Sequence, residues 1–169
     1  GMAVADAEHQ LGAGRGSRNM LGMVVSTGVG GGLILNGDLV AGESGNVSFF
    51  GHHSINHTGI RCTCGRIGCV EAYASGPSMV KRALDLGWKS SASDFIALAQ
   101  SARDGDSVAI QAIDEGAHAL AVGIINVCAR IARRPRLVPK IKQNRKVYKV
   151  YTPITVKVRA PAFACGRGH

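Results

Sequence analysis

No uninterrupted apolar run in this sequence approaches the roughly 20 residues that a helix needs to cross a bilayer. The amino terminus also lacks the basic segment and following apolar stretch of a secretory leader. The sequence therefore gives no support to a membrane-spanning or secreted protein, and we expect a cytoplasmic one. Charged residues make up only 18% of the 169 residues and hydrophobic residues 46%. This balance excludes wholesale disorder and allows one packed domain.

Acidic residues are absent from residues 132–169, although this segment holds 11 of the 20 lysines and arginines. The net charge of +9 therefore belongs to this tail, because the rest of the chain is close to neutral. Three interpretations of the tail stay open: a basic arm for nucleic acid or another acidic surface, a solvated or strand-forming extension, and the product of a shifted reading frame. The shifted frame accounts best for the missing acids, so we do not expect nucleic-acid binding.

The remaining chain alternates apolar runs with glycine-rich turns and then changes to helical periodicity. Residues 20–26 are a candidate buried strand, and Asn36-Gly37 between two apolar runs predicts a hairpin with a type I′ turn. Helices are expected to begin near Pro77, near Asp94 and near Asp106, the last of them reaching Ile131. In the tail, a strand at a sheet edge is expected after Pro153, where apolar and polar residues alternate.

Residues 26–32 have the sequence Ser-Thr-Gly-Val-Gly-Gly-Gly and lie between two apolar runs. Successive glycines let main-chain N–H groups turn toward an anion, and the Thr27 hydroxyl adds a donor. Neither a Lys-Ser/Thr pair nor a helix follows, so the segment is neither a P-loop nor a dinucleotide-binding turn. A phosphate-binding turn and a tight β-turn without a ligand are both open at this point.

Three of the five cysteines lie within eight residues: Cys62, Cys64 and Cys69. Three cysteines this close, together with a histidine, are typical of a Cys3His zinc site, whereas a cluster of free thiols is the alternative. Four protein ligands leave no open position for water, so such a site would be structural. The histidine candidates upstream are His52, His53 and His57. Cys128 is expected to be an ordinary buried thiol on the long helix, and Cys165 has no assigned role.

Several segments together resemble the ROK family of bacterial sugar kinases and sugar-responsive repressors. They are the glycine-rich residues 12–16 and 26–32, Gly51-His52, and residues 62–76, Cys-Thr-Cys-Gly-Arg-Ile-Gly-Cys-Val-Glu-Ala-Tyr-Ala-Ser-Gly. The spacing His-x9-Cys-x-Cys-Gly-x-x-Gly-Cys-x-Glu is highly specific, and the resemblance extends over about residues 3–131. It implies a partial actin-like (ribonuclease-H-like) α/β ATPase fold in residues 1–131, with a zinc-binding loop and a long carboxy-terminal helix. Residues 132–169 would form a basic tail outside the family domain.

The resemblance also implies roles for individual residues. A structural Zn²⁺ would be held by His52, Cys62, Cys64 and Cys69. His52 would also face the sugar, Glu71 would bind sugar hydroxyls, and Thr27 and Gly28 would contact phosphate. Intact relatives would use ATP and Mg²⁺ to phosphorylate a hexose (glucokinases) or an N-acetylhexosamine, and a homo-oligomer without a membrane partner is implied.

The departures from the family pattern matter as well. Phe49 stands where the family has a sugar-binding glutamate, which leaves sugar hydroxyls unpaired at about 1–3 kcal/mol for each lost bond. The catalytic aspartate would fall before Gly1, and the adenosine-binding glycine turn after the long helix is missing. Asp6 is the carboxylate nearest to the missing aspartate and the candidate for a substitute base, whereas a solvated helix residue is the alternative. We therefore expect a glucokinase-like fragment truncated at both ends, with no catalytic residue and no activity in isolation. The alternative is the sugar-sensing domain of a ROK repressor without its DNA-binding segment.

Overall fold

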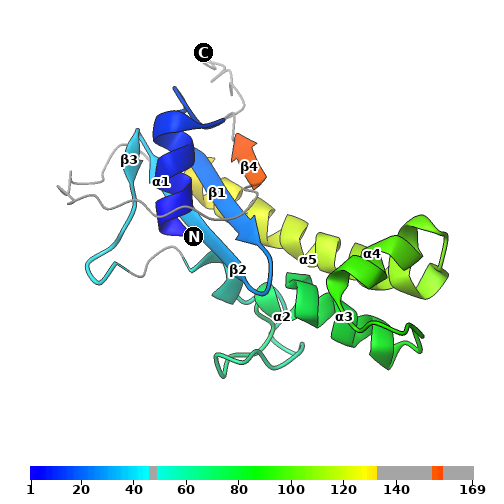
Figure 1. Ribbon diagram of the computed structural model, residues 1–169. Helices are drawn as coiled ribbons and strands as arrows, with labels where there is room; N and C mark the ends of the chain where they lie inside the picture. The colour runs from blue at the N-terminus through cyan, green and yellow to red at the C-terminus, as the bar shows by residue number, and fades with distance from the viewer. Residues whose placement is uncertain (46–48, 133–153, 158–169) are drawn as a thin grey trace, which may run out of the picture.

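The computed structural model describes residues 1–45, 49–132 and 154–157 of the chain, and the side chains of 130–132 and 154–157 are not described. The protein is an α/β structure in which a small sheet is followed by a group of helices (Figure 1). In chain order its elements are α1 (Met2–Leu11), β1 (Met20–Val25), β2 (Val29–Leu35), β3 (Asp38–Leu39), the 3₁₀ turn η1 (Phe50–His52), α2 (Glu71–Ala74), α3 (Gly76–Asp85), α4 (Phe95–Arg103), α5 (Ser107–Ala132) and β4 (Ile154–Lys157).

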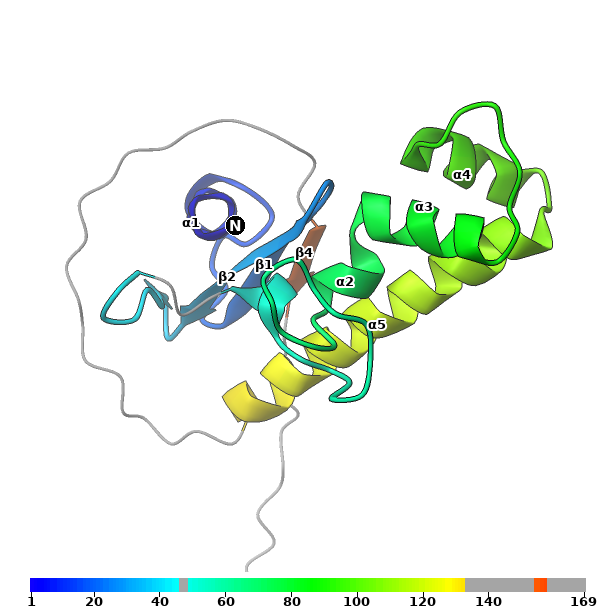
Figure 2. The ribbon, with the colours of Figure 1, turned by 90° about the horizontal axis from the view of Figure 1, so that it is seen from below.

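The sheet has the strand order β3-β2-β1-β4, and each neighbouring pair is antiparallel. Helix α1 covers one face of the sheet and α5 runs along the other, so the sheet is the middle layer (Figure 2). The strand predicted after Pro153 is confirmed as β4, and it lies at the sheet edge as expected. The other predicted features of the tail lie outside the described residues.

Side chains of β1 alternate between the two faces of the sheet. Leu21 and Met23 point to a core that contains Phe50 and Val127, whereas Met20 packs with Ala5 of α1 on the other face. This alternation follows from the two-residue period of a strand and explains why both faces of β1 are apolar.

Glycines in the paired strands allow α1 to approach the sheet closely. Gly22 and Gly32 are direct partners in the β1–β2 register, and Ala5 lies over both of them. A Cβ at Gly32 would come within 2.5 Å of the Ala5 Cβ, and one at Gly22 within 2.7 Å. The glycine-rich segment of residues 26–32 does not lie wholly between the strands, because β2 already begins at Val29 and only Ser26–Gly28 turns.

Most local sequence signals are confirmed. Asn36 and Gly37 both have positive φ, 55° and 90°, as a type I′ turn requires. Asp94 caps α4 by accepting from the Ala97 N–H at 2.8 Å, and Asp106 accepts from two N–H groups in the first turn of α5. Helix α2, only four residues long, was not anticipated from the sequence.

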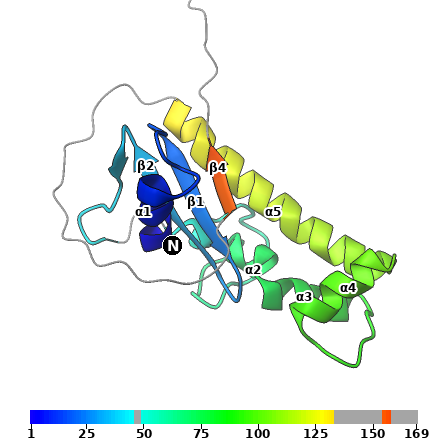
Figure 3. The same cartoon turned by 45° about the horizontal axis from the view of Figure 1, so that its top comes forward.

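Helices α3, α4 and α5 form a second core at the end of α5 that lies away from the sheet (Figure 3). Trp88 is only 3% exposed and packs in this core with Leu98 and Met79. The outer sides of the helices are joined by Arg82 and Glu115, whose side chains form two hydrogen bonds of 2.6 and 3.0 Å between α3 and α5. The long helix is thereby fixed to the segment that follows α2.

Part of α5, Ser107–Ala129, is long and apolar enough by length and composition to cross a membrane. This differs from the expectation from the sequence, in which no uninterrupted apolar run was long enough to cross a membrane. A core helix of a soluble protein passes the same test, and α5 packs against α2, α3 and α4. One such helix is therefore weak support for a membrane span.

The Arg82–Glu115 pair makes stability depend on pH. Hydrogen bonding to Arg82 holds the pKa of Glu115 below its ordinary value of 4.5. The stabilisation that the Arg82–Glu115 pair gives to the folded state is therefore complete above pH 4.5. It is lost as the pH falls through the lower pKa that Glu115 has in the folded state. We expect Glu115→Gln to lower the melting temperature slightly at pH 7, because the pair is partly exposed, and to have a progressively smaller effect as the pH falls below 4.5. Thermal melts followed by circular dichroism over a range of pH test this, with the neighbouring Asp114→Asn as control, and a Glu115→Gln deficit that does not shrink as the pH falls would contradict it.

Candidate functional site

The four side chains predicted to bind a metal come together in the folded chain. The ligand atoms of His52, Cys62, Cys64 and Cys69 all lie within 4.8 Å of one another. They come from η1 and from the loop of residues 53–70, which we call the cysteine loop. His53 and His57, the other candidates from the sequence, do not belong to this group.

The spacing of the four groups suits a tetrahedral zinc ion. The sulfurs of Cys64 and Cys69 are 3.7 Å apart, and the Cys62 sulfur is 3.8 Å from His52 Nδ1. Zn–S bonds of about 2.3 Å in a tetrahedron separate two sulfurs by about 3.8 Å. Both the donor set and its spacing therefore fit zinc, although the ligand assignment stays a prediction.

Hydrogen bonds and glycines shape the cysteine loop around these ligands. The Cys62 N–H donates to the Arg66 carbonyl at 2.8 Å, which closes the turn that carries Cys64. Gly68 has a φ of 74°, and a Cβ there would lie 1.7 Å from the Asn56 carbonyl oxygen. From outside the loop, the hydroxyl of Tyr73 accepts from the Ile60 N–H at 3.0 Å. The loop is thus held in shape by α2 as well as by its own main chain.

The thiols of the cluster have different electrostatic surroundings. Burial raises the pKa of Cys69 to about 12, whereas the main-chain N–H of Arg66 lowers that of the exposed Cys64. A dication between the sulfurs stabilises thiolates and shifts such pKa values downward. A dication at this position would offset the cost of ionising the buried Cys69 thiol, which otherwise donates to the His52 carbonyl at 3.7 Å.

Glu71 connects the cysteine loop to the β1–β2 turn. Its Oε2 accepts from the Val29 N–H at 2.8 Å, and its Oε1 lies 4.0 Å from His52 Nδ1. The absence of a side chain at Gly28 leaves room for this contact, since a Cβ there would lie 2.8 Å from the same Oε2 and would displace it. With one oxygen engaged by the turn, the other is available to accept a hydrogen bond from a ligand.

Thr27 and Glu71 line one cavity of about 550 Å³, which we call the Thr27–Glu71 cavity. The structure therefore brings the predicted phosphate-binding turn and the predicted sugar-binding carboxylate to the same hollow. Ser75 and Ser78 add hydroxyls to its wall, and the cysteine loop contributes residues 60–63. Sequence reasoning had not placed the loop or these serines there, because their proximity to Thr27 depends on the folded chain.

Phe49 and Asp6 were also singled out from the sequence, and the structure shows what each of them contacts. Phe49 is 54% exposed and stacks against the ring of His52, with 6.0 Å between the ring centroids. Asp6 lies on α1, where it accepts a hydrogen bond from Gln10, and it lines none of the cavities described in this section. The structure thus places an aromatic ring beside His52 and gives no support to Asp6 as a substitute base.

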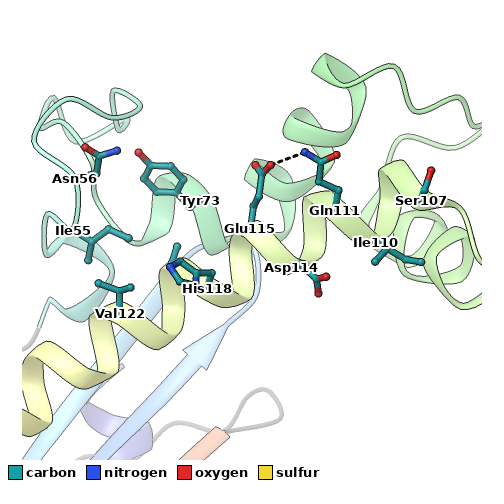
Figure 4. Close-up of a pocket in the computed structure, with 11 residues that line it drawn as sticks. Ile55, Asn56, Tyr73, Ser107, Ile110, Gln111, Asp114, Glu115, His118 and Val122 are labelled. Atoms are coloured by element: carbon teal, nitrogen blue, oxygen red, sulfur yellow. Dashed lines mark hydrogen bonds between the residues drawn. The ribbon is translucent and has the colours of Figure 1, made fainter.

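A larger cavity of about 870 Å³ lies between α5 and the start of the cysteine loop (Figure 4). Its wall includes Ile55, Tyr73 and Val122, and its polar side chains include Asp114 and His118. None of the predicted metal, sugar or phosphate ligands lines it. Of the predicted ligands, Thr27, Cys62 and Glu71 line the Thr27–Glu71 cavity, whereas His52 lines a third cavity of about 610 Å³.

Comparison with known proteins gives a consistent family. The family model described as the ROK family matches residues 2–134. An N-acetylmannosamine kinase of Yersinia pestis (strain Pestoides F) is 42% identical over 121 residues, which cover 72% of this chain and 40% of that protein. The chain thus spans about 40% of the length of the curated relatives that it matches.

Solved structures of this family share the fold. A ROK hexokinase from Thermus thermophilus superposes with a TM-score of 0.70 at 33% identity, over 76% of this chain and 44% of that one. A ROK glucokinase from Streptomyces griseus, solved with glucose and AMPPNP, has a TM-score of 0.66 at 31% identity, over 76% and 46%. A ROK transcriptional regulator, a homologue of Escherichia coli Mlc, has a TM-score of 0.65 at 28% identity, over 77% and 35%.

The ligand set predicts about one equivalent of zinc in the purified chain, measured by elemental analysis. Cys64→Ser should lower the zinc content and the melting temperature, because it removes one of four thiolate or imidazole ligands from an exposed position. Cys128→Ser, outside the cluster, is the matched control and should leave zinc unchanged. Less than about half an equivalent in freshly purified wild-type protein would count against the site.

Proposed function

This chain belongs to the ROK family, and we propose that it forms the sugar-binding and phosphate-contacting part of a ROK sugar kinase. The observation that carries the proposal is the Thr27–Glu71 cavity, which joins a glycine-containing turn to a carboxylate beside His52. The similarity to an N-acetylmannosamine kinase and to a glucokinase supports a hexose or N-acetylhexosamine as the acceptor and ATP with Mg²⁺ as the donor. The proposed fold of the intact protein is the actin-like ATPase fold.

In this proposal Glu71 recognises the sugar. A carboxylate accepts hydrogen bonds from neighbouring hydroxyls, and the Val29 N–H holds it in one orientation before the sugar arrives. The N–H groups of the turn and the Thr27 hydroxyl would orient the phosphates, since phosphoryl transfer depends on positioning and on neutralising charge. His52, Cys62, Cys64 and Cys69 would hold Zn²⁺, which supplies a structural crosslink that keeps the cysteine loop beside Glu71.

We assign no proton transfer to a residue of this chain. Glu71 is engaged by the turn, and Asp6 does not line the cavity. We therefore propose that the 169 residues alone bind the sugar but do not phosphorylate it. A coupled assay that detects ATP-dependent sugar phosphorylation above background would overturn this part of the proposal.

We propose further that residues 1–131 are the ROK domain and that 132–169 are a tail outside it, which the extent of the family match supports. The clustered thiols favour the reducing cytoplasm. A homo-oligomer is proposed for the intact protein on the family resemblance alone.

A second candidate is the sugar-sensing domain of a ROK repressor, which the likeness to the ROK transcriptional regulator favours. Both candidates predict sugar binding, but only the kinase fragment requires the β1–β2 turn to bind nucleotide. Titration with ADP bears on the choice, because binding by the wild-type chain supports the kinase fragment over the sensor.

Sugar recognition is tested by calorimetric titration with glucose and with N-acetylmannosamine. Glu71→Gln should weaken binding of the preferred sugar by about 10- to 100-fold, because it removes the charge from the accepting group. The amide oxygen can still accept from Val29, so the fold should survive. Glu43→Gln, an exposed position outside the cavity, is the control. Equal affinities of wild type and Glu71→Gln would contradict the assigned role.

A further inference from the structure

The Thr27–Glu71 cavity is lined by cationic side chains to which the sequence assigned no role. Three cationic side chains line it: Arg61, Lys81 and Arg82. Lys81 pairs with Asp85 at 2.8 Å, and Arg82 makes its two hydrogen bonds to Glu115. In the described parts of the chain, the guanidinium of Arg61 has no hydrogen-bond or ion-pair partner. Arg61 is therefore the cation of this cavity that is free to meet an anion.

The main chain around Arg61 is held from both sides. Arg61 forms an isolated antiparallel β-bridge with Ile67 through the main chain, and the preceding Ile60 donates its N–H to the Tyr73 hydroxyl at 3.0 Å. The following Cys62 donates its N–H to the Arg66 carbonyl at 2.8 Å. The side chain thus starts from a fixed position at the cavity wall, which lowers the entropic cost of binding a ligand there.

We propose that Arg61 binds a phosphoryl group in the Thr27–Glu71 cavity. A planar guanidinium can donate two parallel hydrogen bonds to phosphate oxygens, which a lysine cannot do. Thr27 lines the same cavity and offers a hydroxyl, so the two residues can approach one anion from the β1–β2 turn and from the cysteine loop. The anion is either the terminal phosphate of a nucleotide or the phosphate of a phosphorylated sugar.

This assignment rests on the proposed kinase function, because it makes the cysteine loop part of the phosphate site. It extends the role of that loop beyond holding a metal, since residues 60–63 line the cavity and provide its unpaired cation. The assignment also gives different roles to the two arginines of the cysteine loop, Arg61 and Arg66. Arg66 lies beside His52 and His53 at a different cavity, of about 610 Å³, and does not line the Thr27–Glu71 cavity.

The test is calorimetric titration of the full 169-residue chain with inorganic phosphate, ADP and glucose 6-phosphate at low ionic strength. Arg61→Ala should weaken binding at least about fivefold, and Arg61→Lys should recover only part of the loss. Arg66→Ala is the matched control, with the same change of charge in the same loop, and should change affinity less than about twofold. A loss for ADP alone assigns the site to the nucleotide, and a loss for glucose 6-phosphate alone assigns it to the phosphorylated sugar.

Three results would overturn the proposal: no binding of any phosphate compound to the wild type, equal binding by wild type and Arg61→Ala, or an equal loss in Arg66→Ala. Circular dichroism checks that the variants fold, and Arg61→Lys provides a second reading if Arg61→Ala does not. Titration of the same proteins with glucose and N-acetylmannosamine separates the two levels of inference. If the chain binds sugar but Arg61→Ala does not change phosphate binding, only the phosphate-binding role of Arg61 is refuted. If Arg61→Ala weakens phosphate binding but the chain binds no sugar, the proposed kinase function is refuted.

Discussion

The hydrogen bond from the Val29 N–H to Glu71 holds the candidate site together. It spans 42 positions in the sequence and joins the β1–β2 turn to the first residue of α2. The cysteine loop ends just before Glu71, so the position of the cluster and the position of the turn depend on the same contact. The glycine at position 28 lets the carboxylate approach the turn closely, since a Cβ there would displace Glu71 Oε2. Metal ligands, turn and cavity are consequently parts of one arrangement.

Local signals in the sequence were sufficient for most of the secondary structure. Asn36-Gly37 predicts its turn because both residues tolerate positive φ, and Asp94 and Asp106 predict helix starts because their carboxylates accept from the first turn. The extent of β2 could not be predicted in this way. Glycine is unfavourable in a strand by itself, and the reason for Gly32 is the distant Ala5 packed over it.

In the candidate site, too, some features follow from local sequence and others from contacts between distant residues. The spacing of Cys62, Cys64 and Cys69 predicts a cluster because ligands close in sequence remain close in space, and the structure brings them together with His52. The sequence gives no comparable signal for Arg61, which is one of several arginines until the fold places it beside Thr27. Tyr73 is similar, because its contact with Ile60 depends on how the loop folds back over α2.

The burial of Trp88 has an optical consequence. It is the single tryptophan of the chain and lies in the core formed by α3, α4 and α5, to which none of the predicted metal, sugar or phosphate ligands belongs. Its fluorescence should report on the packing of these helices and respond little to events at the cavity. Emission and far-ultraviolet circular dichroism, followed together during unfolding, would therefore reveal whether the helical core and the sheet core melt as one cooperative unit.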